Sequence, residues 1–211
     1  VILSRSRGGF VGLCAMFLYC WLRTKRKVLV GLFVGFLITF AALFAPSTYW
    51  DRIRTIDTEG ARAGTGQERV YMWKIGWHMF LDNPIMGVGQ GNFPWEFKKY
   101  EVEVMGHEDP FYGRSVAGRV AHSVYFTLLP ELGLIGLFIF GGITYYNYRD
   151  LQRMKKIFLN NKTVDRKNPL QEKYYLTLAL EGGMISFLVS GIFISILYYP
   201  NYWVLMGFIV A

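Results

Sequence analysis

The sequence has few of the residues that build covalent or metal-centred sites. Its 211 residues include two cysteines and three histidines. Cys14 and Cys20 are six residues apart, so they do not share a helix face, and we interpret both as packing residues. His78, His107 and His122 lack the spacing of metal ligands. The sequence therefore predicts chemistry that uses neither a metal nor another cofactor.

Charge is nearly absent from four long stretches, which lie at about 7–22, 28–45, 124–146 and 175–197. Hydrophobic residues make up 53% of the chain, above the usual share for a soluble domain. Each stretch approaches the roughly 20 apolar residues that cross a membrane. We therefore expect an all-α, polytopic membrane protein. A fifth span begins near Tyr202 and is cut short, so we expect the sequence to be a fragment.

Positive charge is concentrated in two short loops. The formal net charge is +8, with basic clusters at 23–27 and 148–173. The positive-inside rule makes these loops cytoplasmic and places 46–121 on the periplasmic side of a bacterial inner membrane. The charge of that long loop is nearly balanced, so the basic excess is a topology signal and no nucleic-acid partner is expected. We divide the chain into two spans at 1–45, a periplasmic loop domain, and the remaining spans at 122–211.

The long loop at 46–121 is rich in aromatic residues, whereas disordered segments are poor in them. An amphipathic helix is expected at 66–81, because apolar residues recur there at spacings of three and four: Val70, Trp73, Trp77 and Phe80. Its indoles suit a helix lying on the membrane surface. The glycine-rich stretch at 87–93 is expected to form a tight turn and to bind no nucleotide.

His122 lies where the long loop enters a span. Neutral imidazole can accept a proton from an attacking hydroxyl, which makes this residue a candidate base. The alternative is a histidine that caps the span and bonds to the backbone. Position alone does not decide between these two interpretations.

Three arginines are candidates for binding an anionic group on the same side: Arg7, Arg69 and Arg119. Arginine makes bidentate contacts with phosphate, which suits a pyrophosphate. The alternative is an arginine that extends to lipid headgroups. Arg69 is favoured by its place on the expected surface helix.

Two acidic residues fall within the expected spans. Glu131 comes nine residues after His122, so it lies on roughly the opposite helix face and should contact a neighbouring helix or a loop arginine. Glu181 is either a proton-relay residue or a group that stays hydrated near the cytoplasmic interface, and we favour the second reading. Ionisable residues at such depth are functional candidates.

The ordered set of motifs resembles the O-antigen ligase/polymerase superfamily of bacterial membrane glycosyltransferases. The matching pieces cover nearly the whole chain and correspond to a C-terminal half: Ser6-Arg7-Gly8, Arg69-x3-Trp73, 83–93, His122-x2-Tyr125 and Glu131-x-Gly133-x2-Gly136. Many relatives carry His-Asn where this chain has His122-Ser123. The Ala-His-Ser form, together with Tyr202-Trp203, resembles the exosortase-associated O-glycosylation ligases.

The resemblance implies transfer of a glycan from undecaprenyl pyrophosphate to a hydroxyl acceptor at the outer face of the inner membrane. The acceptor would be the lipid A core of lipopolysaccharide, a protein or a polysaccharide. It implies His122 as the catalytic residue and the three candidate arginines as the pyrophosphate ligands. Three further residues receive structural or secondary roles: Glu131, Trp73 and Tyr125.

Two other functions stay open at this point. A polymerase of the same superfamily would use another lipid-linked glycan as its acceptor, and the sequence does not separate it from a ligase. A polysaccharide transporter would show repeated or broken spans with several intramembrane charges. The expected spans hold one such charge, Glu181, and no internal repeat.

Overall fold

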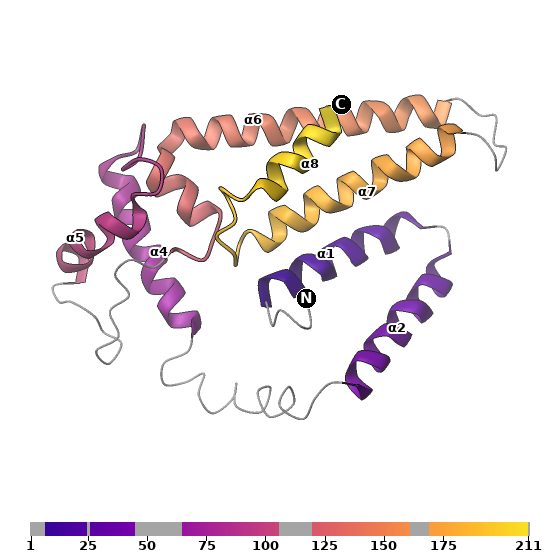
Figure 1. Ribbon diagram of the computed structural model, residues 1–211, viewed down its shortest axis with the longest axis horizontal. Coiled ribbons are helices and arrows are strands. Elements are labelled where there is room, and N and C mark those ends of the chain that lie inside the picture. Colours follow the sequence, from indigo (N-terminus) through magenta and orange to yellow (C-terminus); the bar gives the residue numbers. More distant parts are fainter. Residues whose placement is uncertain (1–6, 25, 45–64, 106–119, 161–168, 211) are drawn as a thin grey trace.

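The computed structural model describes residues 7–24, 26–44, 65–105, 120–160 and 169–210. The regular structure of these residues is helical throughout, which confirms the expected all-α class. The helices, shown in Figure 1, are α1 (Arg7–Arg23), α2 (Lys27–Leu43), α4 (Thr65–Asp82), α5 (Phe93–Met105), α6 (Tyr125–Asn160), α7 (Pro169–Ser190) and α8 (Pro200–Val210).

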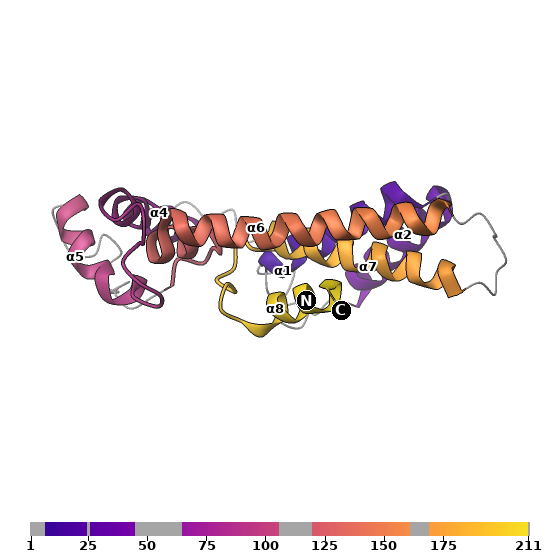
Figure 2. The ribbon, with the colours of Figure 1, turned by 90° about the horizontal axis from the view of Figure 1, so that it is seen from above.

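The molecule is elongated along α6, as Figures 1 and 2 both show. Helix α7 runs back beside α6, α1 packs on α7, and α8 packs against α6 and α7. Helices α4 and α5 gather around the start of α6, and we call this part, 65–105 and 120–133, the loop end. The opposite part, 149–160 and 169–173, is the basic end.

One described helix, α6, is long and apolar enough to cross a membrane by length and composition. Shorter apolar helices lie at 8–23, 27–37 and 200–210. Helix α7 is long enough but carries Glu172, Lys173 and Glu181. The four-span topology therefore remains a prediction, within a structure that is consistent with a helical membrane protein.

Small residues bring α1 and α7 close together. Gly8 and Gly12 lie one turn apart on α1, and a β-carbon at Gly12 would meet Ser190 Cβ at 2.8 Å. The Ser186 hydroxyl donates a hydrogen bond to the Gly12 carbonyl oxygen at 2.8 Å. This is the close contact through small residues that membrane helices use, because lipid offers no hydrophobic drive for helix association.

The two cysteines of α1 lie outside its contact with α7, on different faces of the helix. Cys14 and Cys20 are exposed, and both are free thiols that form no disulfide within the described residues. The expectation that both are packing residues was therefore wrong for the described part of the chain. The reason is rotational, since the glycine face of α1 turns toward α7 and leaves these side chains outside.

Two helix boundaries differ from the sequence expectation. Helix α6 continues to Asn160 instead of ending near 146, because 148–160 has neither glycine nor proline and many good helix formers. Helix α7 ends at Ser190 instead of 197. Gly191 and the alternating isoleucines after it have low helix propensity. Residues 191–199, which we call the strap, form turns and bends at the loop end.

The buried apolar residues form two separate cores. The loop end has its own core between α4 and α5, built from Tyr71, Met72, Ile75, Met79, Phe93, Phe97, Tyr100 and Ala121. The bundle core joins α6, α7 and α8 and contains Val124, Leu128, Phe140, Leu151, Met184, Phe187, Leu197, Tyr202, Met206 and Ile209. The boundary between the two cores lies at residues 121–124, where the chain passes from the loop end to the helix bundle.

Candidate functional site

Helix α6 is broken near its start. Gly133 has φ 60° and ψ −156°, a conformation open essentially to glycine, and Pro130 lacks a backbone N–H. The break frees backbone carbonyl and N–H groups that a continuous helix would pair. Such groups are costly near a membrane unless another part of the protein binds them.

The segment at 84–89, which includes the start of the glycine-rich turn, supplies the missing partners. Its two N–H groups and two carbonyl oxygens pair with both sides of the break, in four backbone bonds: Val88 N to Pro130 O (2.8 Å), Gly89 N to Glu131 O (2.9 Å), Leu134 N to Pro84 O (2.8 Å) and Ile135 N to Ile85 O (3.2 Å). The turn and the broken helix therefore complete each other.

Two glycines permit this close approach. A β-carbon on Gly87 would lie 2.4 Å from the Glu131 carbonyl carbon, and one on Gly133 would lie 2.5 Å from the Ile85 oxygen. Both also have positive φ. The expected tight turn at 87–93 is thus confirmed, and its first glycine, Gly87, is explained by contact with α6.

Glu131 is buried at this junction, with 2% of its surface exposed. Its carboxylate accepts the Gly91 N–H at 2.8 Å, the Phe93 N–H at 3.2 Å and the hydroxyl of Tyr198. Phe93 begins α5, so the carboxylate also lies at the positive end of that helix. Of the two expected partners, the neighbouring helix is confirmed by the contact with Phe93 of α5, whereas a loop amide and the strap take the place of the arginine.

Tyr198 is the side-chain partner of Glu131 in the strap. Burial of its hydroxyl, reinforced by the hydrogen bond and the negative charge of Glu131, raises the pKa of Tyr198 well above its usual range. The phenol therefore stays protonated at neutral pH and serves as a hydrogen-bond donor. Tyr198 lies just beyond the expected span at 175–197, and the sequence pattern predicts no role for it.

His122 is partly buried in the segment that connects the loop to α6. Its φ of 51° is unusual for a residue other than glycine, and backbone strain of this kind clusters at functional sites. The residues on both sides are fixed. The Trp73 indole N–H donates to the Ala121 carbonyl at 2.8 Å, and Ser123 O accepts the Thr127 N–H at 3.0 Å to begin α6.

The same tryptophan relates Arg69 to this segment. Arg69 lies one turn before Trp73 on α4 and is partly buried. The Trp73 ring stacks on Phe126, with centroids 4.9 Å apart and an interplanar angle of 3°. Helix α4 therefore places Arg69 one turn from the tryptophan that contacts both the start of α6 and the residue before His122.

The strap approaches His122 from the bundle side. The Val124 N–H donates to the Gly191 carbonyl at 2.7 Å, and the Tyr125 hydroxyl donates to the Leu188 carbonyl at 2.8 Å. Both bonds join the start of α6 to the end of α7. Tyr125 thereby connects two helices.

The strap also touches the start of α1. A β-carbon on Gly8 would meet Ile194 Cγ1 at 2.5 Å and Phe193 Cβ at 3.1 Å. Arg7 is the first residue of α1, so its backbone lies beside the strap. The side chain of Arg7 and the whole of Arg119 lie outside the described residues. Within the described part, Arg69 and His122 belong to the loop end, and the backbone of Arg7 lies beside the strap.

Metal-ligating side chains do not gather at this site. Within the described ranges, no group of three or more His, Cys, Asp or Glu residues is arranged to hold a metal ion. His78 is exposed on α4, and His107 lies outside the described residues. Chemistry without a cofactor remains a prediction.

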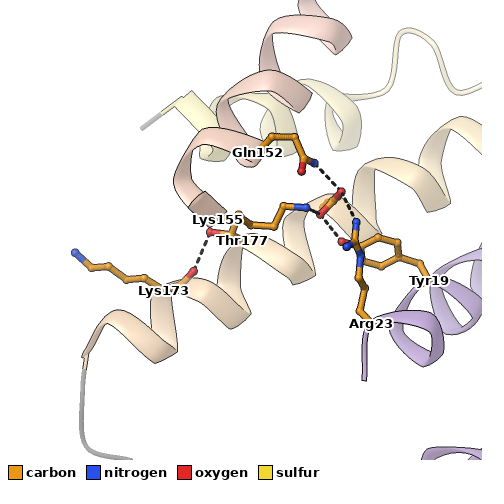
Figure 3. A network of polar contacts seen from close by, with 7 residues as sticks. Tyr19, Arg23, Gln152, Lys155, Lys173 and Thr177 are labelled. Atoms are coloured by element: carbon orange, nitrogen blue, oxygen red, sulfur yellow. Dashed lines mark hydrogen bonds and ion pairs between the residues drawn. The ribbon is translucent and has the colours of Figure 1, made fainter. Parts of the chain in front are cut away.

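A second polar cluster lies toward the basic end and is centred on Glu181. The carboxylate accepts hydrogen bonds from Lys155 Nζ and the Tyr19 hydroxyl, and from Gln152 Nε2 at 2.9 Å. Arg23 adds an ion pair at 3.8 Å. Figure 3 shows these four side chains, two from α1 and two from α6, pointing to a common centre on α7.

Glu181 is 1% exposed, so the expectation that it stays hydrated was wrong. The extension of α6 beyond the expected span brings Lys155 to this site, where protein groups replace water around the carboxylate. Lys155 itself is 6% exposed. The sequence predicts the pair of Lys155 and Glu181 only indirectly, because the pairing depends on the continuation of α6 through 148–160.

Comparison with known proteins assigns the chain to a protein family. A family model described as O-antigen ligase matches residues 1–141, which is most of the chain. The chain belongs to the O-antigen ligase family, a family of membrane proteins that join or polymerise polysaccharide. It is also similar to the teichuronic acid biosynthesis protein TuaE of Bacillus subtilis, with 28% identity over 97% of this chain. The match spans 39% of the length of that relative.

Proposed function

We propose that this chain is the part of a membrane glycosyltransferase that moves a glycan from undecaprenyl pyrophosphate to a hydroxyl acceptor. The observation that carries the proposal is the convergence at the loop end. His122, in a strained backbone conformation, lies on the segment held by Trp73, and Arg69 lies one turn from that tryptophan. The family supplies the class of reaction.

The chemistry requires a base and an anion site. His122 accepts the proton of the acceptor hydroxyl, while the oxygen of that hydroxyl attacks the anomeric carbon of the glycan. The bond from that carbon to the pyrophosphate oxygen breaks, and the lipid pyrophosphate leaves with the bonding electrons. Arg7 and Arg69 stabilise the negative charge that develops on it, with Arg119 as a further ligand.

The loop end is proposed to face the periplasm, with the basic end in the cytoplasm. Arg149, Arg153 and Lys156 lie at the basic end, in agreement with the positive-inside rule. At the loop end several large apolar side chains are exposed, as expected for a surface that meets lipid: Val70, Trp77, Leu81, Ile85 and Met86. Trp73, which the sequence analysis placed on this face, packs on Phe126 instead.

A polymerase of the same family is the second candidate. The similarity to a protein of teichuronic acid biosynthesis favours the assembly of a polysaccharide chain. Product analysis separates the two functions. Growth of the glycan in chain length marks a polymerase, whereas attachment of the glycan to a different acceptor marks a ligase.

The transporter reading gains no support from the broken α6. Discontinuous helices of transporters use their free backbone groups to bind a substrate or an ion. Here the groups released at Gly133 bind the turn at 84–89.

The central test is glycan transfer by the full-length protein carrying His122→Ala, Arg7→Ala or Arg69→Ala. We expect losses of about 100-fold or more for His122→Ala, within the range for general base catalysis. His78→Ala and Lys74→Ala are matched controls, because both residues are exposed on α4. Wild-type transfer by all three site variants, at equal protein levels, would overturn the proposal.

A further inference from the structure

The strap contacts two of the elements that carry candidate residues, the start of α6 and the start of α1. Gly191 binds the N–H of Val124, two residues after His122. Ile194 packs on Gly8, the neighbour of Arg7. The strap is therefore fixed to α6 and α1 before it reaches its last contact.

That last contact is the hydrogen bond from Tyr198 to Glu131. The same carboxylate holds Gly91 and Phe93, so Tyr198 is one bond removed from the glycine-rich turn and the start of α5. Helix α5 packs on α4 through the loop core. Since α4 carries Arg69, the strap is connected to the anion site as well as to the base.

We propose that Tyr198 is a positioning residue for the transfer reaction, which acts through Glu131 to fix the loop end on the bundle. This inference rests on the proposed function. The bond joins two parts with separate hydrophobic cores, and a displacement between them would move α4, which carries Arg69, relative to α1, which carries Arg7. Misplacement of reacting groups by about 1 Å can cost about 100-fold in rate.

The phenol is suited to this role by its chemistry. Its raised pKa keeps the proton on the oxygen, so the donor is present over the whole neutral range. Tyr198 occupies one oxygen of the carboxylate, and the loop amides use both oxygens. Removal of the hydroxyl leaves the amide bonds in place but detaches the strap from them.

Tyr198→Phe in the full-length membrane protein is the decisive variant, because it removes the hydroxyl and keeps the ring. Tyr199→Phe is the matched control, since Tyr199 is the exposed neighbour and donates its backbone N–H to Ile196 O, a bond that the substitution keeps. The first measurement is hydrogen exchange of the peptide 83–93. We expect Tyr198→Phe to raise exchange there by about threefold or more, with Tyr199→Phe unchanged.

The second measurement is the rate of transfer at equal amounts of folded protein. We expect Tyr198→Phe to lower kcat by about tenfold, with KM for the lipid-linked donor within about twofold. A purely structural role would lower the yield or melting temperature and leave kcat per folded molecule unchanged. Glu131→Gln combined with Tyr198→Phe should lower kcat by less than the product of the single effects, because both act through one bond.

The two readouts separate this inference from the proposed function. Wild-type exchange in Tyr198→Phe, or faster exchange with an unchanged kcat, would each overturn the positioning role. Multiplicative effects in the double variant would overturn the route through Glu131. If the wild-type protein transfers no glycan to any acceptor, the proposed function fails and the positioning role fails with it, whereas the exchange result still reports whether the strap is fastened.

Discussion

The two buried glutamates of this protein are satisfied in different ways. Glu131 at the loop end accepts hydrogen bonds from backbone N–H groups and a tyrosine, and none of these partners in the described part of the chain is a cation. Glu181 is paired with Lys155, with Arg23 nearby. One carboxylate organises a loop around itself, whereas the other is one half of an ion pair between helices.

The difference indicates which property of the protein, its stability or its transfer activity, each glutamate should affect. Glu131 and Gln152 are separated by about 30 Å along α6, at 1.5 Å per residue, which is close to the thickness of the hydrocarbon core of a membrane. The Glu181 cluster joins α1, α6 and α7 far from His122, so it should affect stability. The Glu131 cluster touches the elements of the candidate site, so it should affect transfer.

The largest effect should come from Lys155→Met. Removing the lysine leaves Glu181 buried without its closest cation, which costs about 3–5 kcal/mol when a buried pair is broken. The measurement is the free energy of unfolding in detergent, and Lys156→Met is the exposed control. Transfer per folded molecule should be unchanged. A loss of transfer in folded Lys155→Met would break the comparison between the two glutamates.

Gly133→Ala should come next and should act at the other glutamate. Alanine strains the backbone at positive φ, and its β-carbon collides with the Ile85 carbonyl, so we expect about 3 kcal/mol of destabilisation. Gly141→Ala is the matched control on the same helix, because no atom lies within 4 Å of its β-carbon. Equal unfolding free energies for the two variants would contradict the docking of the turn on α6.

Trp73→Phe should have a moderate effect on stability and a larger one on transfer. The lost hydrogen bond to Ala121 and the smaller ring should cost about 1–2 kcal/mol. Because Ala121 precedes His122, the transfer rate should also fall. Trp77→Phe, at an exposed position, should change the free energy of unfolding by less than about 0.5 kcal/mol. A transfer rate that tracks only the amount of folded protein would show that Trp73 acts on the fold alone.

The smallest effect is expected from Arg153→Ala. Its ion pair with Asp150 spans 3.5 Å at the surface of α6, with both side chains well exposed. Exposed pairs contribute at most a few tenths of a kcal/mol, so the melting temperature should hardly move. A large loss of melting temperature would show that the exposed ion pair of Arg153 contributes as much to stability as the buried Glu181 cluster.

The sequence was sufficient for the helical class, the surface helix near 66–81 and the tight glycine turn, because each follows from local patterns of apolar residues and glycines. The long-range contacts were not accessible. Nothing local to Glu131 shows that its partners are Gly91 and Tyr198, which come from opposite sides of it in the chain. The end of α7 could have been found, since Gly191 and the isoleucines after it weaken a helix.

The mutual pairing of the turn at 84–89 and the break at Gly133 has a consequence for how the protein is made. The turn leaves the ribosome before α6, yet its backbone partners lie on α6. The loop end therefore cannot complete its fold until α6 has been synthesised and folded. For the same reason a chimaera of two family members should exchange residues 83–93 and 130–136 as one unit, because either piece alone would bring unpaired backbone groups to the membrane boundary.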